Sequence, residues 1–174
     1  MAKRLFVLSI LIVINTACSI TRDIDELAVV VSAQNGSDFM VGAVQFDDSW
    51  SAPAGSVGCC WTNGGKMSFT YDIPFPKKVV VAWYDMDTDL FRVGEATIDN
   101  KAGYEFIKEM KPFIDRRTGQ YKDRKLPYLI VGMKRNGLIK VWISNAPGNY
   151  LGRQILEIGS GMAQIKELPP EDER

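Results

Sequence analysis

Residues 128–144 read Tyr-Leu-Ile-Val-Gly-Met-Lys-Arg-Asn-Gly-Leu-Ile-Lys-Val-Trp-Ile-Ser. Two apolar runs, Tyr128–Met133 and Leu138–Ser144, flank the polar residues 134–136 and Gly137. Asn136-Gly137 between such runs is a strong hairpin signal, because a type I′ turn needs positive φ at both central residues. The stretch therefore predicts two antiparallel strands joined by a tight turn.

Short apolar runs of the same kind recur through most of the chain. Val79–Tyr84 is continuously apolar and predicts a buried central strand, and Leu90–Ile98 follows it across a polar turn. Further strands are expected over the ranges Leu27–Ala33, Phe39–Phe46, Lys66–Tyr71 and Tyr150–Ile158. This pattern favours a mainly-β single domain, an antiparallel β-sandwich more than a barrel.

One segment departs from the strand pattern. Asp99-Asn100 can cap a helix over Lys101–Lys111, and Pro112 then closes it. Apolar residues fall near one face of this helix, at Phe106, Ile107, Met110 and Phe113. We therefore expect one helix inserted in the β domain.

The N-terminus has the organisation of a secretory signal peptide. Lys3 and Arg4 precede ten mostly apolar residues, 5–14, which are too few to span a bilayer comfortably. Ala17-Cys18 then resembles the lipobox of bacterial lipoproteins, although Asn15 stands where an apolar residue is usual. The resemblance implies a lipid on Cys18, and Ser19 after it favours the outer membrane. The alternative is a soluble secreted protein cleaved after Ala17.

These features divide the chain into four parts. Residues 1–17 are the expected signal peptide, 18–26 the lipidated N-terminus and tether, 27–166 the mainly-β domain, and 167–174 an acidic tail expected to be disordered. No later segment reaches transmembrane length. The predicted location is the outer membrane, with the domain facing the periplasm or exposed at the cell surface.

Composition excludes several kinds of function. Of 174 residues, 21 are basic and 21 acidic, and loss of Lys3 and Arg4 with the leader lowers the basic count to 19. A near-neutral surface gives no general attraction to nucleic acid. The chain has no His, so no His-dependent catalytic relay and no His-ligated zinc site can form.

Cys59-Cys60 is the most unusual dipeptide of the chain. The periplasm is oxidising, but adjacent Cα atoms lie closer together than a disulfide usually requires. Three interpretations stay open: a bridge between the neighbours, two separately packed thiols, or an intermolecular bond. A redox-catalytic role is disfavoured, because no Cys-x-x-Cys motif is present.

The remaining candidates for chemistry have simpler explanations. Asp85–Asp89 alternates carboxylates like a calcium loop, but it lacks the glycine and the distal glutamate, so a solvated turn is expected and no metal site. Nothing pairs the carboxylates of Asp47-Asp48 with those of Glu105 and Glu109. The tryptophans are expected in or near the core, at Trp50, Trp61, Trp83 and Trp142, with sugar stacking by Trp50 beside a loop as the alternative. The basic segment 111–125 is expected to be a solvated loop, with docking of an acidic partner as the alternative. We therefore predict no catalytic residue and no cofactor.

The order of motifs resembles a family of small bacterial lipoproteins that carry a domain of unknown function. The resemblance rests on Trp50–Gly55, on Gly58-Cys59-Cys60-Trp61, on Pro74 and Pro76 before Val79–Asp85, and on Leu129–Met133 and Gly137–Trp142. Some relatives resemble immunity lipoproteins that are paired with lipase effectors of type VI secretion systems.

This resemblance implies a non-enzymatic, membrane-anchored protein whose partner is an effector toxin. The alternative hypothesis is an accessory envelope lipoprotein that binds an assembly partner or a small ligand. Neither hypothesis assigns partner-binding residues.

Overall fold

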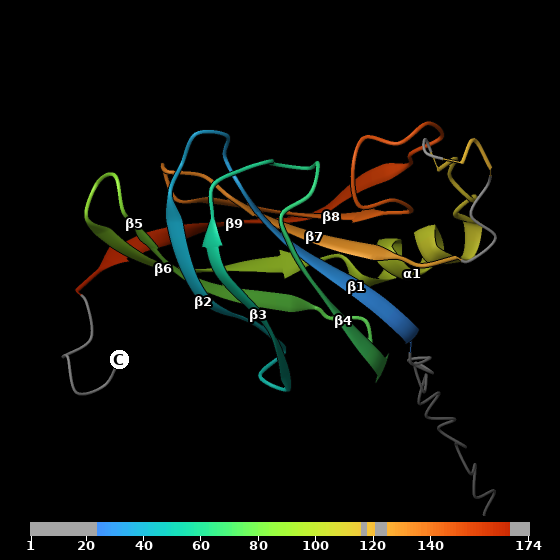
Figure 1. Ribbon diagram of the computed structural model, residues 1–174. Helices are drawn as coiled ribbons and strands as arrows, with labels where there is room; N and C mark the ends of the chain where they lie inside the picture. The colour runs from blue at the N-terminus through green and yellow to red at the C-terminus, as the bar shows by residue number, and fades with distance from the viewer. Residues whose placement is uncertain (1–23, 116–117, 121–124, 168–174) are drawn as a thin grey trace, which may run out of the picture.

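The computed structural model describes residues 24–115, 118–120 and 125–167 (Figure 1). The expected leader, Cys18, residues 116–117 and 121–124 of the basic segment, and residues 168–174 lie outside this range. Within it, nine strands and one helix follow in the order β1 (Ile24–Ala33), β2 (Phe39–Phe46), β3 (Trp50–Val57), β4 (Lys66–Ile73), β5 (Lys78–Asp85), β6 (Leu90–Ile98), α1 (Asn100–Glu109), β7 (Tyr128–Met133), β8 (Leu138–Ser144) and β9 (Ile155–Lys166).

All nine strands belong to one sheet, in the order β3-β2-β5-β6-β9-β8-β7-β1-β4. The sheet coils into a nearly closed barrel, with β3 and β4 as its two edges. Every pairing is antiparallel except that of β1 with β7, which is parallel. Pro53 lies in edge strand β3, where a missing N–H costs the sheet little.

The expected sandwich is therefore wrong, although the mainly-β single domain with one helix is confirmed. A sandwich needs two separate sheets, whereas β9 pairs with both β6 and β8 and makes the sheet continuous. Glycines allow the close approach of β6 and β9: a Cβ on Gly161 would lie 1.9 Å from the Glu95 carbonyl oxygen, and one on Gly159 would lie 2.4 Å from that of Thr97. Glycine in a strand commonly marks such a tight bend.

The barrel interior is the main hydrophobic core. Strand β5 alternates between buried and partly exposed residues, which is the period expected of a strand with one inward face. Trp83 is fully buried and its ring lies 6.0 Å from that of Phe39. Neighbouring strands supply inward aliphatic residues, among them Val29, Val131, Val141 and Ile143.

Helix α1 closes one end of the barrel. The Asp99 carboxylate accepts a hydrogen bond from the Ala102 N–H at 3.0 Å, which confirms the expected cap. Phe106 and Ile107 pack against the barrel core, and the Tyr104 hydroxyl accepts a hydrogen bond from the Phe75 N–H. The helix ends at Glu109 rather than at Lys111.

A second, smaller cluster lies on the outside of the barrel. Its buried members point outward from β1, β7 and β8 and are Ala28, Val30, Tyr128, Ile130 and Trp142. Trp61 and Leu126 pack against them from the connecting segments. We call this surface the covered face.

Candidate functional site

Four connections gather at the end of the barrel opposite α1. They join β1 to β2 (residues 34–38), β3 to β4 (58–65), β5 to β6 (86–89) and β7 to β8 (134–137). Figure 1 shows these loops rising from the same end of the strands, away from the helix. We call this surface the loop end.

Arg135 ties three of these loops together. Its Nε lies 3.3 Å from Oδ2 of Asp85, whose side chain is fully buried, and its guanidinium also pairs with the Asp87 carboxylate. Its Nη2 donates to the Gly36 carbonyl at 3.5 Å. The Arg135 guanidinium therefore lies against the buried Asp85 side chain and fixes the loops at this end of the barrel.

The expectation for residues 85–89 is confirmed in part. The segment is a turn, with the Asp89 N–H donating to the Asp85 carbonyl at 2.9 Å. Asp85, however, is buried against Arg135 and not solvated. Among the described residues, no group of carboxylates or thiols has a metal-binding arrangement.

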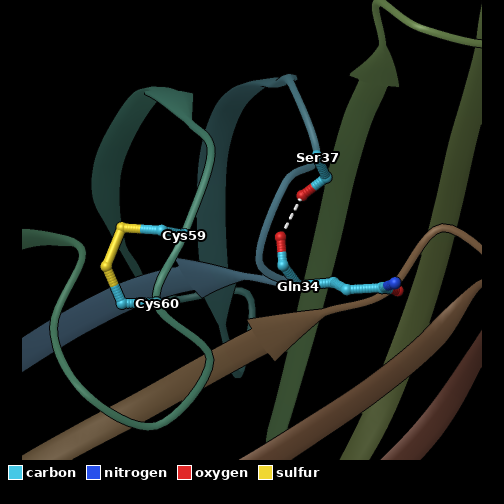
Figure 2. Close-up of a disulfide and its surroundings, with 4 residues drawn as sticks. All are labelled: Gln34, Ser37, Cys59 and Cys60. Atoms are coloured by element: carbon cyan, nitrogen blue, oxygen red, sulfur yellow. Dashed lines mark hydrogen bonds between the residues drawn. A yellow bond between two sulfur atoms is a disulfide. The ribbon is translucent and has the colours of Figure 1, made fainter.

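The segment Cys59-Cys60-Trp61 is attached to the end of β1. The Ala33 N–H donates to the Cys59 carbonyl at 2.9 Å, and the Trp61 N–H donates to the Ala33 carbonyl at 2.8 Å. Cys59 and Cys60 are joined by a disulfide across a cis peptide bond, which is the first of the three interpretations left open by the sequence. Figure 2 shows this disulfide beside the turn that contains Gln34 and Ser37. Cys59 is exposed and Cys60 is half-buried.

Trp61 is the aromatic centre of the loop end. Its ring packs edge-on against Trp142, with 5.0 Å between ring centroids, and Lys134 Nζ lies 4.7 Å above it. Gly132 makes room for this pair, since a Cβ there would lie 2.7 Å from the Trp142 ring. A cation over an indole face is favourable, so Lys134 is held over the ring without a carboxylate.

An open cleft of about 840 Å³ lies next to Trp61. It is lined by one indole, two cations and three amides, from Gln34, Asn35, Trp61, Lys134, Arg135 and Asn136. Amide groups both donate and accept hydrogen bonds, and Trp and Arg are enriched where proteins bind one another. Within the described lining there is no carboxylate and no nucleophile beside a base.

Arg153 fastens the loop between β3 and β4 to the loop between β8 and β9. Its guanidinium donates to Ser144 Oγ at 3.2 Å, to Asn63 Oδ1 at 2.6 Å and to the Thr62 carbonyl. All three acceptors are neutral, and burial lowers the pKa of the Arg153 guanidinium below its ordinary value. This fastening holds Trp61 over the covered face.

The other sequence candidates are structural. The Asp47 carboxylate accepts hydrogen bonds from the N–H groups of Lys77 and Lys78, and Asp48 pairs with Lys78 at 3.1 Å. Glu105 and Glu109 are exposed on α1. Trp83 is in the core, and Trp50 stacks on Phe46.

Sequence reasoning missed Arg135 and Arg153. The Asn136-Gly137 turn locates Arg135 in a hairpin, but its partner Asp85 is 50 residues away in the chain. No local pattern links Arg153 to residues 62 and 63 either.

Comparison of the chain with protein-family models, with curated proteins and with solved structures finds no match. Among the described residues, no helix is long and apolar enough to cross a membrane.

Proposed function

We propose that the protein is a non-catalytic bacterial lipoprotein that binds a protein partner through its loop end, as an immunity protein that inhibits a type VI secretion phospholipase. The observation that carries this proposal is the loop end itself. It places an indole, amides and cations around one cleft, and Arg135 ties together three of the loops at this end. Ordered surfaces that carry Trp and Arg suit tight protein binding.

The direction of strand β1 is a second reason to propose the loop end as the binding surface. Strand β1 begins at Ile24, at the α1 end of the barrel, and reaches the loop end at Ala33. Cys18 precedes Ile24 by six residues, so a lipid on Cys18 would hold the α1 end within about 20 Å of the membrane. Ten residues of strand span about 33 Å, so the loop end would face away from the lipid.

The partner class comes from the resemblance of the motif order to immunity lipoproteins. A phospholipase delivered to the periplasm acts at membrane lipid, where a tethered inhibitor is already concentrated. Inhibition requires a surface that covers an active-site entrance and requires no catalytic group. An interface of about 1,600 Å² is sufficient for a stable complex.

A rescue assay tests the proposal. The open reading frame next to this gene is expressed with a periplasmic leader in a neutral host, with and without this protein. We expect the product of the neighbouring reading frame to kill the host and this chain to restore growth. We expect the double variant Trp61→Ala and Lys134→Glu to lose this rescue. The control is Leu151→Ala, which removes an exposed apolar side chain at the α1 end. The immunity function would be refuted if the neighbouring gene product is not toxic, or if it kills the host equally with and without this chain.

The size of the cleft favours a second candidate, an accessory envelope lipoprotein that binds a small polar ligand. Pockets for small molecules commonly enclose about 300–1,000 Å³, and the cleft is within this range. Trp61 fluorescence reports on such binding, and soluble cell-wall fragments are the first ligands to titrate. Saturable quenching that Trp61→Phe abolishes, together with a harmless neighbour, would favour this candidate.

A further inference from the structure

The outer surface opposite the covered face is apolar and has nothing packed on it among the described residues. It consists of the outward side chains of β2, β5, β6 and β9, and we call it the open face. Its apolar members are Met40, Val80, Tyr84, Phe91, Val93 and Met162. Met40 is 49% exposed and Met162 is 58% exposed, and the others are partly exposed.

The register places these residues in three rows across the strands. Met40, Tyr84 and Phe91 are cross-strand neighbours and form the first row, which ends at Lys166. Ala82, Val93 and Gln164 form the middle row. Gln45, Val80, Glu95 and Met162 form the third.

The only described helix, α1, packs on the end of the barrel and leaves the open face bare. Four strands about 4.8 Å apart and three rows about 7 Å apart give a face of about 400 Å². Its polar members are Gln45, Glu95, Gln164 and Lys166. The remaining side chains are apolar, and exposed apolar patches on monomeric proteins are often functional.

We infer that the open face binds the open face of a second copy of this chain. Charge placement is the reason to choose a second copy over another protein. Lys166 ends the first row and Glu95 lies in the third, so the two are placed on opposite sides of the middle row. A two-fold axis lying in the interface along the middle row brings Lys166 of each copy beside the partner's Glu95.

Neither charge has an ion-pair partner within its own chain among the described residues, so both are available across the interface. A patch of about 400 Å² is about half of what one partner contributes to a standard interface, and the polar rim supplies the remainder. Attachment to one membrane would raise the effective concentration of the two copies and favour the pair.

Site-specific photo-crosslinking of the full chain in cells tests this inference. A benzophenone amino acid replaces Met162 on the open face, or Met67 on β4 as the matched control, since Met67 is 45% exposed and lies on the opposite side of the barrel. The host lacks the neighbouring reading frame, so the result does not depend on the immunity function. We expect a product of twice the chain mass from position 162 and none from position 67.

Charge reversal then tests the geometry. Glu95→Lys places like charges together and lowers the yield of dimer about fivefold, and Lys166→Glu does the same. The double variant restores the yield to within about twofold of the original, because each pair is rebuilt with its signs exchanged. All these side chains are exposed, so folding is preserved, and circular dichroism of each variant verifies it.

Three results would overturn the inference. The first is that the probe at position 162 gives no crosslinked product. The second is that it gives a product of another mass. The third is that the double variant crosslinks no better than the single variants.

Discussion

The covered face and the open face are two sides of one barrel, built from strands of one sheet, yet they differ in what lies on them. Ala28, Val30 and Ile130 point outward and are still buried, because Trp61 and Leu126 pack over their cluster. On the other side Met40 and Met162 are about half exposed. The connections decide the difference: the loop of residues 58–65 folds over the covered face, whereas residues 86–89 form a tight turn.

Because of this difference, the covered face contributes to the stability of the fold, whereas the open face is available for binding. Burial of apolar area stabilises the fold by about 25 cal/mol per Å², so side chains of the covered face contribute to folding. The open face gains that contribution only when another surface is placed on it. Truncation of an outward side chain should therefore cost more on the covered face than on the open face.

The largest contrast is expected between Trp142→Ala and Val93→Ala. Trp142 is 7% exposed between Trp61 and the sheet, and its removal leaves a cavity that lowers the free energy of unfolding by about 3–5 kcal/mol. Val93 is partly exposed on the open face, and its truncation costs about 1 kcal/mol or less. Urea denaturation of the two variants measures both values, and equal costs would contradict the distinction between the faces.

Two glycine substitutions make the next contrast. A Cβ at Gly132 meets the rings of Trp142 and Trp61 at 2.7 and 3.2 Å, so Gly132→Ala displaces the indoles and costs about 1–3 kcal/mol. A Cβ at Gly42 in β2 meets nothing within 4 Å, so Gly42→Ala is neutral or slightly stabilising. Thermal unfolding checks the pair, and tryptophan fluorescence should shift in the Gly132 variant alone.

A smaller effect is expected where the covering loop is fastened. Arg153→Met leaves the Thr62 carbonyl and Asn63 without their donor, at a cost of about 1–2 kcal/mol. The change should appear locally, as faster hydrogen exchange of residues 58–65 with little change in β5 and β6. Uniform acceleration throughout the barrel would show that Arg153 supports the whole fold instead.

The smallest effect concerns Lys78 at the margin of the open face. Its hydrogen bond and Coulomb attraction to Asp48 raise its pKa. The pairing therefore stabilises the fold fully below the unfolded pKa of Lys78, and the contribution is lost as pH rises through the raised folded pKa. The Lys78 pKa in Asp48→Asn, followed by NMR, should return toward its ordinary value, and an unchanged pKa would show that Asp48 is not the cause.

The local pattern of apolar residues was sufficient to predict the position of most strands. The expected ranges for β2, β6, β7 and β8 match the observed bounds, because each is a short apolar run that ends at a turn. Strand β3 was not predicted, since Pro53 and Gly55 weaken its pattern. The last strand was placed too early: β9 spans Ile155–Lys166, where glycines interrupt the apolar alternation.

The pairing of strands that are far apart in the sequence could not be predicted from local pattern. The period of two shows that one side of a strand is buried, and it says nothing about whether the sheet closes. Both faces of β1 are buried, because Ala28 and Val30 lie under the covering loop, so its sequence carries no polar face from which the inward side could be recognised. The Arg135–Asp85 pair is likewise formed only when distant hairpins meet.

The parallel pairing of β1 with β7 has a consequence for how the chain reaches its native state. Ala28 faces Tyr128 and Ala33 faces Met133, so each pair joins residues 100 positions apart. A protein dominated by such distant contacts folds slowly, in about milliseconds to seconds, because a long loop must close before any contact stabilises it. Synthesis proceeds from the N-terminus, so β1 can pair with β4 early, but its other edge stays unpaired until β7 has been made. A chaperone that binds this edge, at Val29–Val31, would shield it during that interval.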